Sequence, residues 1–383
     1  MQKMKITVAI DSFKGSITSS EAAEAVRLAA LSELPDAEIY SAVLADGGEG
    51  TVDAFLSALG GKKHQCAVTG PLGEPVSAEY GITDDGTAII EIASAAGLPL
   101  VPEDKKDPLN TTTYGVGELI SDAIGRGVRN FIVGLGGSAT NDGGAGMLAA
   151  LGFKLQDGEG NPIPLGAGGL SMLERIDTSA ALGALSECRF TVACDVKNPL
   201  LGERGASCVF GPQKGACPKS VQYMDGLLKK FANLTSEALG SFCENDEGAG
   251  AAGGLGFAFI SYLGASLVPG IDLIASAAGL RERIRESDLV ITGEGRLDGQ
   301  SGMGKAPIGI AKIAKEYRKP VIAFCGSVGV GAEELNSLGI DAYFPIIGAP
   351  CTLACAMDKQ RAKENLYRTA KQAIRLFIVG SKQ

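Results

Sequence analysis

The chain has 383 residues, more than one hydrophobic core usually supports, so we expect two domains. Hydrophobic residues make up 45% of the sequence, glycine occurs 54 times and aromatic residues account for 5%, which is typical of α/β proteins and excludes disorder. The net charge of −9 argues against nucleic acid and anionic membranes as partners, so an anionic substrate would have to meet a local cluster of cations.

The cysteines and the first residues indicate a cytoplasmic protein. Nine cysteines are scattered without a disulfide framework, and the closest pair, Cys351 and Cys355, lacks the further ligands of a zinc site. The one histidine, His64, follows two lysines and is expected at the surface, which argues against histidine acid–base chemistry. No basic and then apolar leader precedes the first strand.

The first polar loop follows a predicted strand at residues 6–10 and precedes a helix with a capping box, Thr18 and Glu21. In a doubly wound sheet, the loop at the carboxyl end of such a strand lines the ligand crevice. The candidate side chains of this loop are Asp11, Ser12 and Lys14. A helix cap and a solvated charge explain the aspartate and the lysine equally well when each is taken alone.

A second predicted strand, at residues 39–44, leads through glycines and carboxylates to a helix at residues 52–59. Asp46 and Glu49 flank two glycines, which would let a ligand approach closely. The two carboxylates could hold Mg²⁺ or a substrate hydroxyl. Capping of the helix by acidic residues is the alternative.

Three short alternating runs, at residues 65–69, 76–82 and 87–92, predict an antiparallel meander. The change from strand–helix units to hairpins marks a candidate domain boundary near residue 66.

A helix expected at residues 114–125 leads to a strand at residues 130–135, which ends in GGSATNDGGAG. A glycine-rich turn between a strand and a helix points backbone N–H groups outward and binds an anion. The candidate binding residues are Gly136, Gly137, Ser138, Thr140, Asn141 and Asp142. A dinucleotide site is disfavoured, because GxGxxG with its ribose-binding acid is absent.

A strand predicted at residues 189–194 ends in Asp195, with Lys197 and Asn198 close by. An aspartate at this position can act as a general base or hold a metal ion. An Asx turn before Pro199 is the alternative.

The uncharged stretch at residues 248–271 is long enough to cross a bilayer. Its glycines and Pro269 favour a buried, glycine-interrupted helix pair instead. Amphipathic patterns predict further helices at residues 221–239 and 272–285.

Residues 289–311 read LVITGEGRLDGQSGMGKAPIGIA and predict a strand to Thr292, a glycine-rich anion nest and a helix with Pro307 in its first turn. Residues 299–305 match GxxxxGK, but Ala306 replaces the Ser or Thr that a P-loop uses for Mg²⁺. The candidate groups are Gly293, Gly295, Ser301, Gly302 and Gly304 for phosphate, Arg296 and Lys305 as cations, and Glu294 and Asp298 for Mg²⁺. A glycine-rich connection with solvated charges is the alternative.

Strand–helix alternation returns with strands at residues 320–324 and 342–347, a helix from residue 332 and a last helix near residues 359–378. The first and last parts of the chain share this pattern, and the middle lacks it.

We therefore expect an α/β fold of two domains. A discontinuous Rossmann-like or flavodoxin-like parallel-sheet domain comprises residues 1–66 and 287–383. A larger mixed α/β domain with the antiparallel meander, residues 67–286, is inserted. The crevice between the domains is where the polar loops are expected to converge.

Five segments resemble the signatures of bacterial glycerate kinases of the first structural class: AIDSFKGS, ADGGEGT, GLGGSATNDGGAGM, CDVKNPL and TGEGRLDGQSGMGKAP. Their order and spacing agree across nearly the whole chain. The resemblance implies ATP-dependent phosphorylation of glycerate to a phosphoglycerate, a two-domain α/β fold with one flavodoxin-like part, and a Mg²⁺ requirement. It also implies a cytoplasmic role in glyoxylate and sugar-acid breakdown.

Phosphoryl transfer depends mainly on aligning the acceptor hydroxyl and on neutralising charge on the transferred group. We expect the two glycine-rich loops to share the phosphates and the glycerate carboxylate. The expected catalytic groups are Lys14, Arg296 and Lys305 as cations and Asp195 as acceptor of the hydroxyl proton. Mg²⁺ would be held by some of Asp46, Glu49, Asp195, Glu294 and Asp298.

Two alternatives stay open: a non-catalytic two-lobed protein that binds small acids, and a nucleotide-linked oxidoreductase. The sequence also leaves open which hydroxyl is phosphorylated, which loop holds ATP and whether the chain forms a homo-oligomer.

Overall fold

The computed structural model describes residues 3–45, 47–240, 242–299, 301–303 and 305–380, and the chain divides into two compact units. Unit 1 comprises Met1–Asp46, Asp53–Leu59 and Gly270–Gln383, and unit 2 comprises Gly47–Val52 and Gly60–Pro269. This division differs from the boundaries expected near residues 66 and 287. Residue 66 lies inside the strand at Lys62–Thr69, which belongs to unit 2 as a whole, and the helices at Gly270–Ala277 and Leu280–Glu286, which precede residue 287, pack within unit 1.

Unit 1 is built on a parallel sheet whose strands are β1 (Lys5–Ile10), β2 (Glu38–Val43), β11 (Leu289–Leu297), β12 (Val321–Val328) and β13 (Ala342–Pro345). The spatial order is β2-β1-β11-β12-β13, and each neighbouring pair is parallel. Counted along the chain within the unit, this is the 2-1-3-4-5 order of flavodoxin-like folds. The expected flavodoxin-like sheet is therefore confirmed.

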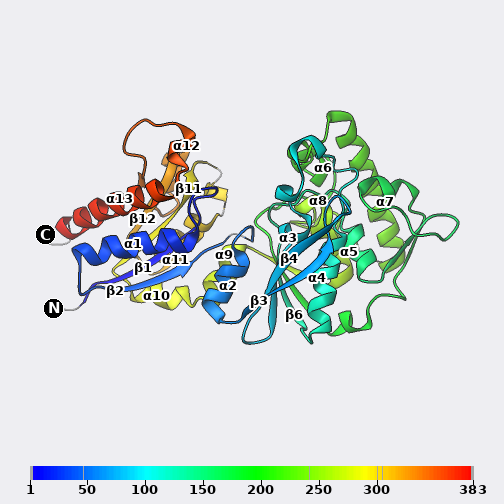
Figure 1. Cartoon of the computed structure of the whole chain (residues 1–383), viewed down its shortest axis with the longest axis horizontal. Helices are drawn as coiled ribbons and strands as arrows, with labels where there is room; N and C mark the ends of the chain where they lie inside the picture. Colours follow the sequence, from blue (N-terminus) through cyan, green and yellow to red (C-terminus); the bar gives the residue numbers. More distant parts are fainter. Residues whose placement is uncertain (1–2, 46, 241, 300, 304, 381–383) are drawn as a thin grey trace. The chain divides into compact units, whose positions relative to one another are not determined.

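Helices cover both faces of this sheet. On one face α1 (Ser19–Glu33) and α13 (Lys359–Gly380) lie side by side (Figure 1), and they share a core with alternate β1 residues such as Val8 and Ile10. The expected capping box at the start of α1 is present, since Thr18 accepts from the Glu21 N–H. Helix α11 (Ala306–Glu316) packs against β1 and β11. Helices α9 (Gly270–Ala277) and α10 (Leu280–Glu286) pack against α11.

Three expectations in this unit differ from the structure. The strand expected to end at Thr292 continues to Leu297, because residues 293–297 pair in parallel with β12. The single helix expected at residues 272–285 is two helices, since Ala278 and Gly279 separate α9 from α10. The segment expected as a helix from residue 332 forms a 3₁₀ helix, Ala332–Asn336.

Unit 2 contains a six-stranded sheet of β3 (Lys62–Thr69), β4 (Pro75–Ile82), β5 (Thr87–Glu91), β6 (Asn130–Gly134), β9 (Arg189–Ala193) and β10 (Ser266–Val268). The spatial order is β10-β9-β6-β5-β4-β3. Strands β3, β4 and β5 are antiparallel neighbours, which confirms the meander. The pairs β5–β6, β6–β9 and β9–β10 are parallel, so their carboxyl ends meet at one edge.

The remaining elements of unit 2 pack around this sheet (Figure 1). The helices are α3 (Ala93–Ala96), α4 (Tyr114–Gly125), α5 (Ala145–Ala150), α6 (Ala206–Phe210), α7 (Pro218–Leu239) and α8 (Ala251–Leu263). A small antiparallel ribbon joins β7 (Lys154–Gln156) to β8 (Arg175–Asp177). Helix α2 (Thr51–Leu59) begins in unit 2 and continues in unit 1, and α12 (Leu353–Ala356) belongs to unit 1.

Residues 248–259 and 270–271 of the uncharged stretch are buried as expected, whereas residues 260–269 are half-buried or exposed. In place of the expected helix pair, the stretch holds one kinked helix, a short strand and the start of α9. Helix α8 carries left-handed backbone at Ala252, Gly253 and Gly254, and the three-residue strand β10 follows it. The short strand escaped the sequence pattern because its place in the sheet depends on pairing with β9. No helix in the described part of the chain is long and apolar enough to span a membrane.

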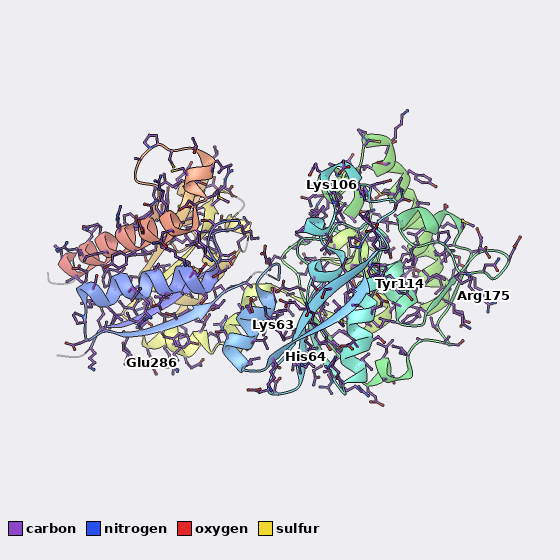
Figure 2. The ribbon with its side chains drawn as sticks, in the orientation of Figure 1. Lys63, His64, Lys106, Tyr114, Arg175 and Glu286 are labelled. Carbon is purple, nitrogen blue, oxygen red and sulfur yellow. The ribbon has the colours of Figure 1, made fainter. Side chains whose placement is uncertain are left out.

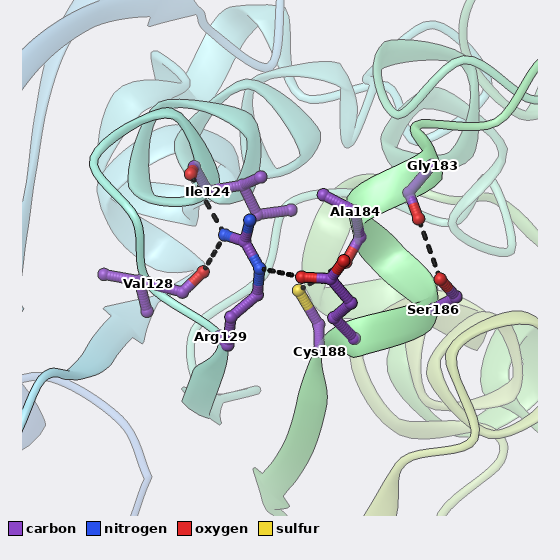
Figure 3. A network of polar contacts seen from close by, with 8 residues as sticks. Ile124, Val128, Arg129, Gly183, Ala184, Ser186 and Cys188 are labelled. Atoms are coloured by element: carbon purple, nitrogen blue, oxygen red, sulfur yellow. Dashed lines mark hydrogen bonds and ion pairs between the residues drawn. The ribbon is translucent and has the colours of Figure 1, made fainter.

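Arg129 ties together the amino ends of β6 and β9 (Figure 3). Its Nε lies 2.9 Å from a Glu187 carboxylate oxygen, and its Nη1 donates to the carbonyls of Ile124 and Val128. The Arg189 N–H donates to the Arg129 carbonyl at 2.8 Å. These bonds help to fix the register that aligns the opposite, carboxyl ends of the two strands.

His64 lies on β3 beside Lys63 (Figure 2). Its ring stacks on Tyr80, with the two centroids 5.7 Å apart. The histidine is half-buried rather than fully at the surface, and its contact is a packing contact on the meander.

Candidate active site

The first group of candidate residues lies at the carboxyl ends of β1 and β11 in unit 1. The chain order of the sheet reverses between these two strands, and ligands of such folds bind in the crevice at this switch point. The Asp11 N–H donates to the Gly293 carbonyl at 2.9 Å, which joins the two loops. A pocket of about 300 Å³ opens here.

Seven of the residues expected from the sequence line this pocket: Asp11, Ser12, Lys14, Glu294, Gly295, Arg296 and Lys305. Four others lie near it without lining it: Gly293, Asp298, Ser301 and Gly302. The expected phosphate contact Gly304 lies outside the described residues. The structure thus brings the loop after β1 together with the end of β11.

The buried carboxylate of Glu294 links the pocket to the start of α11. The Ser301 hydroxyl donates to Glu294 Oε1 at 2.5 Å, and Lys305 Nζ lies 3.8 Å from Oε2. Ser301 is fully buried, so its hydroxyl orients the carboxylate from behind. The lysine, at the N-cap of α11, remains part of the pocket wall.

Arg296 supplies a second cation at the pocket. Its Nε lies 2.9 Å from Asp298 Oδ2, and 67% of its side chain is exposed. An exposed ion pair of this kind contributes little to stability, which leaves the guanidinium available to a ligand.

Gly293 and Gly295 do not form the anion nest expected from the sequence. Both are strand residues, and neither has the left-handed backbone that a nest uses. A Cβ on Gly293 would lie 2.2 Å from the Phe324 carbonyl oxygen, so this glycine serves the close pairing of β11 with β12. The expected glycine loop is therefore wrong for residues 293–297.

Sequence reasoning missed much of the pocket lining. The polar residues it missed are Ser16, Ser327 and Asn365, and the apolar ones include Phe13, Ile346, Ile347, Leu353, Ala356 and Met357. Ser327 carried a usable signal, because it stands near the carboxyl end of β12, the next parallel strand. Residues of α12 and α13 carried none, since nothing local places a helix over this edge.

The second group of candidate residues lies in unit 2, at the carboxyl ends of β5, β6 and β9. Glu91, Gly134 and Ala193 stand side by side in the sheet, so the loops that follow them are neighbours. The segment Gly47–Val52 joins these loops, since the Gly136 N–H donates to the Gly47 carbonyl at 3.1 Å. The exposed Glu49 is thereby brought to this edge, whereas Asp46 lies outside the described residues.

The loop after β6 has the geometry of an anion nest. Gly137, Gly143 and Gly144 adopt left-handed backbone, with φ between +65° and +82°. In the described part of the chain, the N–H groups of Gly137, Ser138, Thr140 and Asn141 have no hydrogen-bond acceptor. Gly137 is exposed, so the mouth of this loop is open to an anion.

Asp142 organises the loop from inside. Its carboxylate accepts from the Thr113 N–H and hydroxyl, both at 2.9 Å, and from the N–H groups of Gly144 and Gly146. Burial raises the pKa of this carboxyl, and the four hydrogen bonds act in the opposite direction. Since the side chain is fully buried, Asp142 shapes the loop and does not face its mouth.

Lys214 was missed by the sequence analysis. Its Nζ donates to the Ser138 hydroxyl at 2.8 Å and to the Thr140 carbonyl at 2.6 Å, and only 2% of the residue is exposed. Burial lowers the pKa of this lysine to about 7, and the charge of Asp142 opposes that shift. A lysine in a polar turn is usually solvated, so no pattern in the sequence indicated its burial.

Three further polar groups lie on the loop after β9: Asp195, Lys197 and Asn198. Asp195 is half-buried, two residues beyond the end of the strand. The Asn198 side-chain amide donates to the Arg204 carbonyl at 2.7 Å, so it holds its own loop. Lys197 is well exposed and pairs with Glu247 at 2.9 Å.

No group of three or more metal-ligating side chains occurs among the described residues. Mg²⁺ bound to a nucleotide needs only one or two protein carboxylates, because phosphates and waters complete its shell. Asp11 and Glu294, which line the same pocket, are a suitable pair of oxygen donors.

Comparisons with known proteins agree over nearly the whole chain. Residues 6–378 match the model of the glycerate kinase family. The glycerate 2-kinase of Escherichia coli K12 is 47% identical over 98% of this chain and 99% of its own length. The glycerate kinase of Bacillus subtilis 168 is 48% identical over 96% of each chain. A crystal structure from Salmonella typhimurium LT2, described as a candidate glycerate kinase 2, superimposes with a TM-score of 0.89 at 45% identity, covering 100% of both chains.

Proposed function

The chain belongs to the glycerate kinase family, and from this premise we propose that it transfers the γ-phosphoryl group of ATP to a hydroxyl of D-glycerate. The products are ADP and 2-phosphoglycerate or 3-phosphoglycerate. The match of residues 6–378 to the family carries the proposal. The relatives named above are kinases, so they give no support to a non-catalytic acid-binding protein or to an oxidoreductase.

The nucleotide is assigned to the switch-point pocket of unit 1. One wall of this pocket is apolar, with Ile346, Leu353 and Met357, and another carries cations, among them Lys14 and Lys305. A nucleoside triphosphate has the same division, because its base is apolar and its phosphates are anionic. The lining therefore supports ATP as the occupant of this pocket.

The acid is assigned to the loops of unit 2. The loop after β6 has N–H groups without an acceptor among the described residues and an exposed Gly137 at its mouth. Such N–H groups suit a carboxylate, which an acidic protein otherwise repels. Asp195, at the neighbouring strand end, is the proposed acceptor of the proton from the substrate hydroxyl. Ser138, Thr140 and Asn141 are proposed to bind through their backbone N–H groups.

Transfer forms a bond between the substrate oxygen and the γ-phosphorus, and breaks the bond from that phosphorus to the β,γ-bridging oxygen of ADP. Lys14, Arg296 and Lys305 are proposed to neutralise the charge on the phosphates, which is the main catalytic task in such reactions. Glu294 and Asp11 are the residues proposed to hold Mg²⁺, which would supply further positive charge to offset that of the phosphates. Glu49, Asp195 and Asp298 stay secondary candidates for the ion.

A cytoplasmic location is also proposed. All nine cysteines are free thiols, as expected in a reducing compartment.

An ADP-release assay over a panel of small hydroxy acids tests the proposed function. Purified protein is incubated with ATP, Mg²⁺ and D-glycerate, L-glycerate, lactate, glycolate or tartronate. We expect ADP release with D-glycerate well above the release with every other acid. ADP release that is independent of the acid, or none at all, contradicts the proposal.

A further inference from the structure

The buried lysine of unit 2 has no role in the mechanism described so far. Lys214 lies at the end of the short 3₁₀ helix Pro212–Lys214, far along the chain from the loop that it contacts. Its ammonium is bonded to Ser138 and Thr140, on either side of Ala139. A lysine that is almost completely buried is costly to the fold, so its retention calls for a compensating role.

We propose that Lys214 is a positioning residue for substrate binding: it holds Ser138 and Thr140 so that the loop presents its free N–H groups to an oxyanion at the mouth, where Gly137 is exposed. The proposal rests on the proposed function. The oxyanion is a carboxylate of the acid or a phosphate of the nucleotide, which share this chemistry.

Three observations carry the proposal. First, the two hydrogen bonds from Lys214 are the ones that fix the conformation of the Ser138 side chain and the Thr140 carbonyl. When this carbonyl accepts from the lysine beneath the loop, the peptide that follows it turns its N–H, that of Asn141, away from the ammonium. That N–H has no acceptor within the described residues, and neither have those of Gly137, Ser138 and Thr140.

Second, buried polar atoms around the lysine are left without partners. Among the described residues, Thr140 Oγ1 and Asn141 Oδ1 are buried and unpaired, whereas the Asn141 amide nitrogen donates to Ser207 at 2.8 Å. A loop that was only a structural turn would be expected to satisfy these groups. Unpaired buried groups are typical of functional sites, where the conformation serves a ligand.

Third, the charge beneath the loop favours an anion above it. The charged side chain that acts on Lys214 is Asp142, and it is occupied by four hydrogen bonds within its own loop. No salt bridge joins the two residues among the described ion pairs, so the lysine charge is not cancelled by direct contact. An oxyanion at the mouth would be attracted by that charge, and the attraction is stronger in the buried interior, where the dielectric constant is low.

The test compares three full-length variants with the wild type: Lys214→Met, Lys214→Arg and, as a matched control, Lys230→Met. Lys230 also donates to a main-chain carbonyl and pairs with a carboxylate, but it is partly exposed and lies on α7, outside the candidate site. KM for glycerate, KM for ATP, kcat and the thermal midpoint are measured for each. Glycerate binding without ATP is measured by calorimetry.

We expect Lys214→Met to raise the KM of one substrate by about tenfold or more, with the other KM within about twofold. A selective rise for glycerate identifies a carboxylate at the loop, and one for ATP identifies a phosphate. Lys214→Arg should show a smaller rise in the same KM, and Lys230→Met should have the KM values of the wild type.

Equal changes in both KM values, or unchanged kinetics, overturn the proposal. A purely structural lysine predicts a lower midpoint with an unchanged ratio of the two KM values. If Lys214→Met does not fold, Ser138→Ala replaces it. That variant removes the hydrogen bond from Lys214 to the Ser138 hydroxyl and changes the side-chain volume little. Absence of kinase activity in the wild type would contradict the proposed function. Calorimetry with glycerate would still test the positioning role of Lys214.

Discussion

The N–H of Gly136 donates a hydrogen bond of 3.1 Å to the carbonyl of Gly47, although the two residues belong to loops far apart in the chain. The contact leaves no space for side chains, since a Cβ on Gly136 would lie 2.5 Å from the Gly48 Cα. These glycines therefore let two segments with candidate site residues, Glu49 and Ser138, lie at the same edge of the unit 2 sheet.

Gly136→Ala should separate these two segments. We expect the variant to lose about 1–3 kcal/mol of unfolding free energy, as overpacked sites do, and most of its activity. Gly125→Ala is the matched control, because Gly125 ends α4 and a Cβ at this position would have no other heavy atom within 4 Å, so the variant should be neutral. Denaturant titration and steady-state assays measure both. A Gly136→Ala protein as active and stable as the control would show that the close approach is not needed.

Asp195→Asn tests the proposed proton acceptor. Removal of a catalytic group of this kind should lower kcat by about 10²–10³ while the thermal midpoint stays near that of the wild type. Asp104→Asn, in an exposed 3₁₀ turn, controls for loss of a surface charge and should keep full activity. Turnover of Asp195→Asn within about threefold of wild type would remove this residue from the mechanism.

Leu353→Asp tests the nucleotide assignment. Leu353 is 77% exposed on α12 and lies on the apolar wall of the unit 1 pocket, where the base is proposed to bind. A carboxylate at this position should raise the KM for ATP by about tenfold, because its charge would have to be desolvated against the base. Val330→Asp is matched in exposure, at 94%, but Val330 does not line the pocket, so its KM values should stay at the wild-type level. If Leu353→Asp instead raises only the KM for glycerate, the two assignments must be exchanged.

The pH dependence of binding should follow the titration of Lys214. Its pKa is lowered to about 7 by burial, so the side chain is charged below pH 7 and becomes neutral above it. An oxyanion binds better beside the charged form, so the affected KM should be lowest below pH 7 and rise between about pH 7 and 9. Asp142, the charged group that acts on the lysine, has a raised pKa of its own, and Asp142→Asn separates its contribution. Lys214→Arg keeps its charge over this range, so its KM should be flat, and a wild-type KM independent of pH would contradict the role of the charge.

Local patterns were sufficient to predict the framework of the fold. The capping box at Thr18 and Glu21 and the apolar run of β1 are short-range signals, and both elements form where they were expected. The position of Asp11 at the switch point followed from the rule that loops at the carboxyl ends of parallel strands line the crevice. Most of the residues predicted around Lys14 and Glu294 accordingly line one pocket.

What was missed depends on contacts between distant residues. The extension of β11 through Gly293 and Gly295 is fixed by pairing with β12. The sequence alone does not predict it, because glycine is a poor strand former. The burial of Lys214 depends on the loop that Ser138 belongs to, and nothing near residue 214 encodes that contact. The segment Gly47–Val52 likewise belongs to unit 2 because of contacts with distant residues, such as the hydrogen bond from Gly136 to Gly47.

Phosphorus NMR of the reaction mixture is the most direct measurement of the central claim. Purified protein, ATP, Mg²⁺ and D-glycerate should give ADP and one new phosphomonoester signal, whose coupling to the glycerate protons identifies the phosphorylated hydroxyl. ADP with inorganic phosphate alone, or unchanged ATP, would contradict the assignment of this chain as a glycerate kinase.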